Sequence, residues 1–299
     1  MNRPDPFRTL VCFHAHPDDE AISTGGLMAK AAAAGHRVIV VTATNGEMGE
    51  PTPGVLDEGE NLADRRLREL ARSAEILGAQ PPRLLGYRDS GMMGEPSNDD
   101  PACFWRADVD AAAARLAEQL ADVDVDVLII YDDHGLYGHP DHIQVHRVGL
   151  AAAPLLGVEQ VYEATVDRDA ITEATEAMGD QLAEAGIELP AGGRPGPEFG
   201  TARDDLSYQV DVSAYTALKR KALATHQSQV ASDSMFLSIP EDLFAAMFGL
   251  ESYAVPGRTG TGGPRLVDLL PGLDRSRPAR GVRRVRARRT GAPRRRPRR

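Results

Sequence analysis

Short apolar runs alternate along the chain with longer segments of helical pattern. The continuous hydrophobicity typical of strands buried on both faces covers residues 9–13, 36–42, 83–86, 126–131 and 160–166. Alanine-rich or amphipathic segments typical of helices cover residues 21–34, 62–77, 107–121 and the stretch that starts at Pro140. Because strands that alternate with helices pair in parallel, this order predicts an α/β fold with a mostly parallel sheet and helices on both faces.

The pattern continues less regularly beyond the fifth apolar run. We expect helices over residues 167–185, 213–229 and 240–248, a strand over 206–212 and an edge strand over 251–255. Residues 186–205 are rich in glycine and proline, which favours a surface loop or lid. These elements predict one domain over residues 1–256, a linker over 257–274 and a tail over 275–299.

Polar residues gather where the buried runs end. The first run leads into the stretch His14–Glu20, which holds two histidines and three acids, more ionisable groups than a helix cap needs. Three further polar loops, residues 43–50, 87–94 and 132–146, follow later runs. Ligands of α/β proteins bind at the carboxyl ends of the parallel strands, so we expect these loops to meet in space.

The first and last of these loops contain residues suited to a divalent metal. His16 and Asp19 are three residues apart and can converge on one point, while a helix that starts at Pro140 carries His142 one turn inside. Two histidines and one carboxylate leave positions open for water and substrate, as in catalytic zinc sites. Asp18 lies beside these ligands and is free to take a proton from water.

The motifs AHPDDE at residues 15–20 and GHPDH at residues 138–142 resemble those of the PIG-L/LmbE family of zinc-dependent N-deacetylases. That family includes the mycothiol-pathway N-acetylglucosaminyl-inositol deacetylase and the mycothiol S-conjugate amidase. The resemblance runs from about Leu10 to at least His146. It implies a Rossmann-like fold and the hydrolysis of an N-acetyl or other N-acyl group of a small amino sugar or sugar conjugate.

The resemblance implies a role for each residue of the metal set. His16, Asp19 and His142 are implied to bind zinc, with Fe²⁺ as an alternative ion at the same site. Asp18 is implied to be the general base.

Five further residues match positions near the substrate in that family. His139 is implied to stabilise the intermediate or to protonate the leaving amine, and Tyr137 to help polarise the carbonyl. Arg66, Asp89 and Glu47 match positions that hold the hydroxyl groups of the sugar or inositol.

Several residues also have simpler explanations. Without the resemblance, Arg66 is best explained as a solvated helix charge, and Asp89 as a residue that shapes its Asp-Ser-Gly turn. His14 is expected to be only a strand-end polar group, and His146 to support a ligand rather than to be one. His226 is expected in the core or on the surface without a function.

Other function classes share parts of the pattern. A non-haem iron oxygenase uses the same two-histidine, one-carboxylate set, but a base beside the ligands favours hydrolysis. A dinucleotide enzyme is disfavoured because no G-x-G-x-x-G follows the first strand. Within hydrolases, a mycothiol S-conjugate amidase-like activity is the alternative. A protein that binds nucleic acid or another anionic surface would have to use the basic tail.

The charge of the chain is divided between an acidic body and that tail. Residues 275–299 hold 13 arginines and no acid, so the other 274 residues carry 21 bases against 44 acids. The body is not built to hold nucleic acid, and we expect only non-specific binding through the tail, whose low complexity predicts disorder.

The remaining composition indicates a cytoplasmic protein. The chain has no apolar run of membrane-spanning length, and its N-terminus lacks the apolar middle of a signal peptide. Cys12 and Cys103 are the two cysteines, too few for a disulfide framework. The sequence leaves homo-oligomerisation open.

The composition of the tail predicts that it is dispensable for folding and catalysis. A chain that ends at Asp274 should keep its melting temperature and its catalytic efficiency on a neutral sugar, because the tail has no apolar periodicity with which to bury a face. Only salt-sensitive binding to anionic surfaces should fall. Calorimetry and steady-state kinetics check this, and unfolding or loss of activity on truncation would show that the tail is structural.

Overall fold

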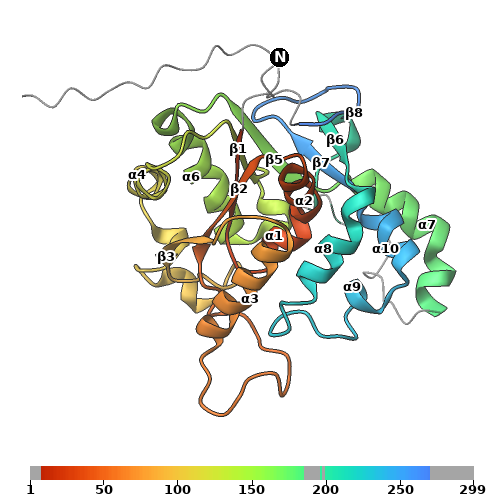
Figure 1. The fold of residues 1–299 in the computed structure, drawn as a ribbon, viewed down its shortest axis with the longest axis horizontal. Coiled ribbons are helices and arrows are strands. Elements are labelled where there is room, and N and C mark those ends of the chain that lie inside the picture. The colour runs from red at the N-terminus through yellow and green to blue at the C-terminus, as the bar shows by residue number, and fades with distance from the viewer. Residues whose placement is uncertain (1–7, 185–195, 197–198, 270–299) are drawn as a thin grey trace, which may run out of the picture.

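One mixed sheet organises the part of the chain that the structure, a computed structural model, describes: residues 8–184, 196 and 199–269. Within these residues the strand order is β3-β2-β1-β4-β5-β7-β6-β8 (Figure 1). The strands are β1 (Thr9–His14), β2 (Arg37–Thr44), β3 (Arg83–Tyr87), β4 (Val127–Tyr131), β5 (Gln160–Thr165), β6 (Tyr208–Asp211), β7 (Leu250–Ala254) and β8 (Arg265–Leu266). The first five are parallel, which confirms the predicted mostly parallel α/β sheet.

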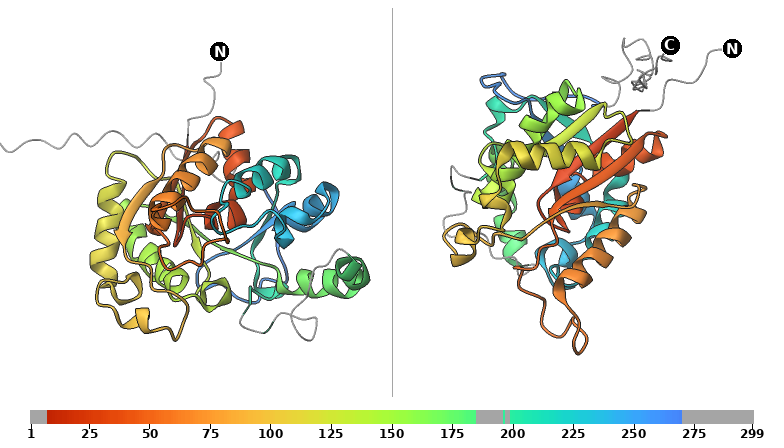
Figure 2. Two further views of the ribbon diagram at one scale, coloured as in Figure 1. Left: turned by 90° about the horizontal axis from the view of Figure 1, so that it is seen from below. Right: turned by 90° about the vertical axis from the view of Figure 1, so that its left-hand side faces the viewer.

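Helices pack on both faces of the sheet (Figure 2). One face is covered by α4 (Val109–Gln119) and α6 (Pro140–Leu156), and the other by α2 (Gly25–Ala33), α3 (Leu62–Ile76) and α8 (Thr216–Leu223). In β1, Leu10 and Cys12 pack into the cluster that includes α2, while Val11 and Phe13 pack into the one that includes α4. Successive side chains of a strand point to opposite faces, so a strand that is apolar throughout needs cover on both.

Two of the expected helices are shorter than predicted. The helix over residues 21–34 is broken at Thr24 into α1 (Asp19–Ser23) and α2, and the helix over 213–229 is limited to α8 and a preceding 3₁₀ turn. The other helices are α5 (Gly135–Gly138), α7 (Arg168–Glu184), α9 (Met235–Ser238) and α10 (Glu241–Phe248). Among the described residues, none of the helices combines the length and the hydrophobicity that crossing a bilayer needs.

The expectation of an edge strand over residues 251–255 is wrong. β7 lies inside the sheet and runs antiparallel to both of its neighbours, β5 and β6. The edge is formed instead by β8, which pairs with β6 and lies in the stretch expected to be a linker. The predicted tail, residues 275–299, and residues 186–195 of the predicted lid lie outside the described residues.

A buried carboxylate on β7 explains the break at Thr24. Glu251 accepts hydrogen bonds from the backbone N–H groups of Gly26 and Leu27, at 2.8 and 2.9 Å, so it holds the start of α2 as a separate helix. Lys219 of α8 lies 2.7 Å from the same carboxylate, and both side chains are at least 96% buried. Glu251 therefore connects β7 with the start of α2 through hydrogen bonds and with α8 through its ion pair.

Removal of this carboxylate should strongly destabilise the fold. Glu251→Ala leaves the Lys219 ammonium buried without its partner, and breaking a buried pair in this way typically costs about 3–5 kcal/mol of unfolding free energy. Arg72→Ala, which breaks an exposed ion pair with Glu75, is the matched control and should cost less than about 1 kcal/mol. Denaturant unfolding of both variants measures the difference, and equal losses would contradict the role given to Glu251.

Candidate metal centre and active site

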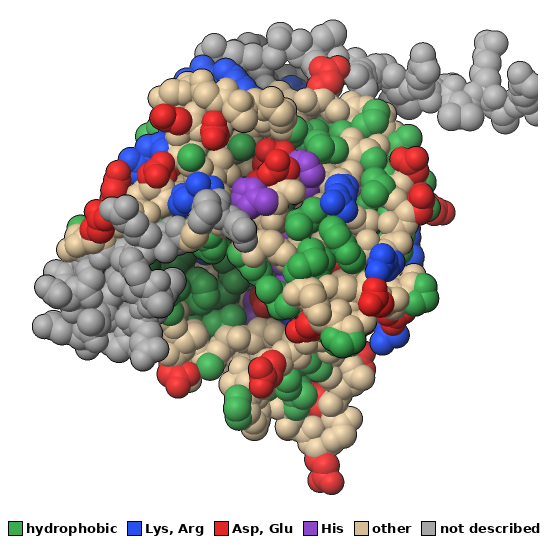
Figure 3. All heavy atoms as spheres, turned by 180° about the vertical axis from the view of Figure 1, so that it is seen from behind, with side chains coloured by type: hydrophobic (Ala, Val, Ile, Leu, Met, Phe, Trp, Pro, Cys, Tyr) green, Lys and Arg blue, Asp and Glu red, His purple; other side chains and the backbone are tan. Residues whose placement is uncertain are grey.

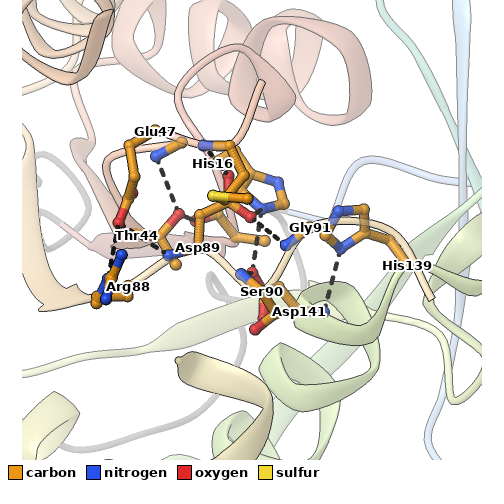
Figure 4. A network of polar contacts seen from close by, with 12 residues as sticks. His16, Thr44, Glu47, Arg88, Asp89, Ser90, Gly91, His139 and Asp141 are labelled. Carbon is orange, nitrogen blue, oxygen red and sulfur yellow. Dashed lines mark hydrogen bonds and ion pairs between the residues drawn. The ribbon is translucent and has the colours of Figure 1, made fainter. Parts of the chain in front are cut away.

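The polar loops meet at the carboxyl edge of the parallel strands, as predicted. Figure 4 shows side chains from the loops after β1, β2, β3 and β4 in one network: His16, Glu47, Asp89 and His139. Because the strands are paired in parallel, their carboxyl ends lie side by side. The loops that follow bring their polar side chains together at this edge, outside the apolar core of the sheet.

The carboxylate of Asp19 lies close to the two histidines that were predicted to bind the metal with it. The carboxylate of Asp19 lies 3.5 Å from Nδ1 of His16 and 3.4 Å from Nε2 of His142. The Asp19 oxygen nearer His16, Oδ2, also accepts the backbone N–H of His16 at 2.8 Å, and this hydrogen bond fixes the loop. Neither ring nitrogen of His142 makes a hydrogen bond, although the side chain is 99% buried. A buried imidazole without a hydrogen-bond partner, facing a carboxylate, suits a metal ligand.

A third histidine shares this cluster. Nitrogen atoms of His16, His139 and His142 lie within 4.8 Å of one another, and so do the ligand atoms of His16, Asp89 and Asp141. The structure therefore offers a histidine and aspartate cluster able to hold a metal ion.

Two carboxylates hold the far side of the His16 ring. Its Nε2 lies 3.3 Å from Asp141 and 3.5 Å from Asp89. Asp141 is fully buried and accepts hydrogen bonds from the backbone N–H and the hydroxyl of Ser90. Burial alone would lower the pKa of His16, but Asp89, Asp141 and Asp19 outweigh it and raise that pKa well above its usual value. Carboxylates that accept the second ring proton in this way orient metal-ligating histidines.

Asp18, the residue predicted to be the base, is buried beside Arg66 and has a raised pKa. Burial raises the pKa of its carboxyl to about 6, although Arg66 opposes the shift. An Nη2 of Arg66 lies 3.3 Å from Asp18 and donates to the carbonyl of Pro17 at 2.7 Å, while Nη1 donates to the carbonyl of Gly46 at 2.7 Å. The explanation of Arg66 as a solvated charge is wrong, because its side chain is 95% buried and lies against Asp18.

His139 is a neutral hydrogen-bond donor in this geometry. It caps α6: its Nδ1 accepts the backbone N–H of Asp141 at 3.1 Å, which leaves Nε2 to carry the ring proton. Burial, followed by the neighbouring His16 and His142, lowers its pKa to about 2. The ring lies 4.6 Å from that of His16, between centroids.

Tyr137 lies at the rim of the cluster on a strained turn. The preceding residue, Leu136, has a φ of +66°, which a branched side chain rarely adopts. The turn is held because Asp132 accepts the N–H of Leu136 at 2.6 Å and Gly200 donates to its carbonyl at 2.8 Å. The Tyr137 ring is 42% exposed and lies 5.1 Å from the ring of His142, between centroids.

The other two predicted substrate residues are also in the network. Asp89 is buried, and it accepts the backbone N–H of Gly91 at 2.9 Å, so it does shape its turn while it contacts His16. Glu47 accepts the N–H of Asp89 at 3.3 Å, and its other carboxylate oxygen has no hydrogen-bond partner.

Sequence reasoning missed three buried residues of this region. Asp141 has no predicted role of its own, although its place in GHPDH beside a predicted ligand was a usable signal. Glu20 and His226 form a fully buried pair with 2.7 Å between Oε1 and Nε2, so of the two places expected for His226, core or surface, it lies in the core. Two other histidines have partners outside the cluster: Nδ1 of His14 lies within hydrogen-bond distance of the Tyr131 hydroxyl, and Nδ1 of His146 lies close to the Glu163 carboxylate.

Comparison with known proteins agrees with this geometry. A sequence profile of the PIG-L family, described as GlcNAc-PI de-N-acetylase, matches residues 11–153. A protein of Acidothermus cellulolyticus named 1D-myo-inositol 2-acetamido-2-deoxy-alpha-D-glucopyranoside deacetylase is 41% identical, over 89% of this chain and 96% of its own length. A protein of the same name from Thermomonospora curvata is 39% identical, over 90% of this chain and 99% of its own.

The fold is similar to solved deacetylase structures. The N,N'-diacetylchitobiose deacetylase of Pyrococcus horikoshii superposes with a TM-score of 0.53 at 21% identity, over 84% of each chain. That similarity concerns the fold alone. The alignments with the two relatives, in contrast, extend over nearly the whole length of those proteins at about 40% identity. The chain therefore belongs to the PIG-L family and is a hydrolytic deacetylase that removes the N-acetyl group of an amino sugar conjugate.

Proposed function

We propose that this chain is a zinc-dependent deacetylase whose substrate is an N-acetylglucosaminyl inositol. The observation that carries the chemistry is the placement of Asp18 beside the cluster of His16, Asp19 and His142. The names of the two relatives supply the substrate.

The residues present fit a zinc ion. The hydrogen-bond-free imidazole of His142, the carboxylate of Asp19 and Nδ1 of His16 are the donor types that zinc takes in catalytic sites, and we propose them as its ligands. Bound there, zinc would supply a Lewis acid that lowers the pKa of a water molecule and polarises the amide carbonyl. The same three donors also suit Fe²⁺.

Asp18 takes the proton of the attacking water. A carboxyl whose pKa lies near 6 is ionised at neutral pH and accepts a proton more readily than an ordinary aspartate. Arg66 holds this carboxylate and the neighbouring carbonyl of Pro17, so the base stays aimed while it is ionised.

His139 and Tyr137 act on the substrate carbonyl. The proton on Nε2 of His139 is placed to donate to the oxygen on which negative charge develops, and the hydroxyl of Tyr137 reaches the same region from the rim. The nitrogen that departs receives the proton that Asp18 took from the water, because a neutral His139 would become an imidazolate if it gave up its ring proton.

We further propose that the sugar lies against the loops after β2 and β3. Glu47 accepts the backbone N–H of Asp89 between these loops, and its other carboxylate oxygen is buried without a partner, so a sugar hydroxyl would reach that oxygen only after a small movement of the loops. Arg66 uses its Nη atoms on Gly46, Pro17 and Asp18, so it supports sugar binding by holding these loops. On the face drawn in Figure 3, basic side chains of the described residues are scattered among acidic and apolar ones, which does not favour a polyanionic ligand.

The ligand assignment predicts that His142→Ala loses the metal. The wild-type chain should retain about one zinc ion after dialysis, and zinc should raise its melting temperature, because binding to the folded state stabilises it. His146→Gln is the matched control: it lies one turn further along α6, pairs with Glu163 and should retain the ion. Elemental analysis and thermal unfolding measure both variants. Full occupancy in His142→Ala would refute the assignment.

The proposed substrate predicts selective release of free amine. N-acetylglucosaminyl inositol should be hydrolysed faster than N-acetylglucosamine or a mycothiol S-conjugate, and a chelator should abolish the reaction. Asp18→Asn should retain the metal and lose about 10²–10⁴-fold in rate, because an amide cannot take the proton. An amine-release assay measures these rates. Preference for the S-conjugate would favour the amidase alternative, and chelator-resistant hydrolysis would contradict the metal mechanism.

A further inference from the structure

Asp18 has an unusual backbone conformation. Its φ of +119° and ψ of −31° lie where a residue with a side chain is strained, and among the described residues Leu136 is the one other non-glycine with a positive φ. Such a conformation persists only where the surrounding structure enforces it. The residues that hold Asp18 are therefore part of how the carboxylate is aimed.

The carboxylate of Glu20 holds the backbone of Asp18. Its Oε2 accepts the backbone N–H of Asp18 at 2.9 Å, across a single intervening residue. Its Oε1 accepts the hydroxyl of Ser73 and lies 2.7 Å from Nε2 of His226. Both oxygens of this fully buried carboxylate are therefore hydrogen-bonded, one to the backbone of Asp18 and the other to Ser73 and His226.

The supports of Glu20 come from distant parts of the chain. Ser73 lies on α3, and His226 follows α8, 206 residues beyond Glu20. The same segment is anchored again two residues later, because Ser228 donates its hydroxyl to Glu69 at 2.6 Å. The segment that carries His226 is thus held in place, so the pair of His226 with Glu20 can fix the position of the Glu20 carboxylate.

Glu20 and His226 form their pair in the interior, where neither side chain is exposed to solvent. Burying a carboxylate and an imidazole is costly, and apolar residues of similar volume pack as well or better. Here the buried pair ends on the backbone N–H of Asp18, the residue with the strained φ of +119° beside the proposed ligand Asp19. The cost is explained if the hydrogen bond to Asp18 is what the pair provides.

We propose that Glu20, held by His226 and Ser73, is a positioning residue that fixes the positive-φ backbone of Asp18 and so aims the base. The proposal rests on the proposed function, which makes Asp18 the base. Glu20 touches neither the substrate nor the metal in this role; it acts through one hydrogen bond to the backbone of Asp18.

The test compares Glu20→Ala, Glu20→Gln and each combined with Asp18→Asn, in the metal-loaded full chain. Glu20→Ala should lower kcat by about 100-fold with little change in KM or metal content, because a misaimed base slows only the chemical step. Glu20→Gln keeps an oxygen for the N–H of Asp18 and should restore most of the rate. In the Asp18→Asn background neither substitution should lower kcat further, because residues that act as a unit are not additive.

Glu251→Gln is the matched control, since Glu251 is also a buried glutamate paired with a cation but has no hydrogen bond to Asp18. It should lower the melting temperature and leave kcat unchanged. If Glu20→Ala behaves like this control, or its loss of rate persists in full in the Asp18→Asn background, the proposal is overturned. If Glu20→Ala does not fold, the same comparison with His226→Gln decides it.

A crystal structure of Glu20→Ala gives a readout that needs no substrate. Asp18 should leave the positive-φ region, and an unchanged φ near +119° would overturn the proposal even if the enzyme hydrolyses none of the sugars tested. Failure of the wild-type chain to hydrolyse any of them would count against the proposed function alone.

Discussion

Buried negative charge at the carboxyl edge of the sheet is the constraint on which the rest of the site depends. Asp19, Asp89 and Asp141 all contact the ring of His16 inside the protein. Carboxylates without water around them require cations or hydrogen-bond donors close by, or they lose their charge. The protein meets part of this need with the Ser90 donors on Asp141 and with imidazoles, and a positive ion in the cluster would meet the rest.

The sequence was sufficient to predict the centre of the site for a physical reason. Continuous apolar runs predict strands covered on both faces, parallel strands end at one edge, and the polar residues that follow them must then meet. His16, Asp19 and His142 come together by this rule alone. The same rule requires helices on both faces, and the two hydrophobic clusters around β1 bear it out.

The missing parts are those in which distant segments decide a local structure. The pair Gly25-Gly26 is the local sign of the break at Thr24, but the carboxylate that holds the start of α2 there comes from Glu251, which is distant in the sequence. Arg66 resembles any charge on an amphipathic helix until the loops that it braces are folded over it. The interior place of β7 depends on pairing with β5 and β6, which local hydrophobicity does not report.

The separation of Glu20 from His226 has a consequence for the order in which the enzyme matures. His142 is the last of the proposed metal ligands in the sequence, and it lies within the part of the chain that matches the family profile, which ends at residue 153. The partner of Glu20 is synthesised more than 70 residues later. His226 is therefore synthesised after every proposed metal ligand, and the hydrogen bonds that hold Glu20 against the backbone of Asp18 cannot be complete until the chain extends past residue 226.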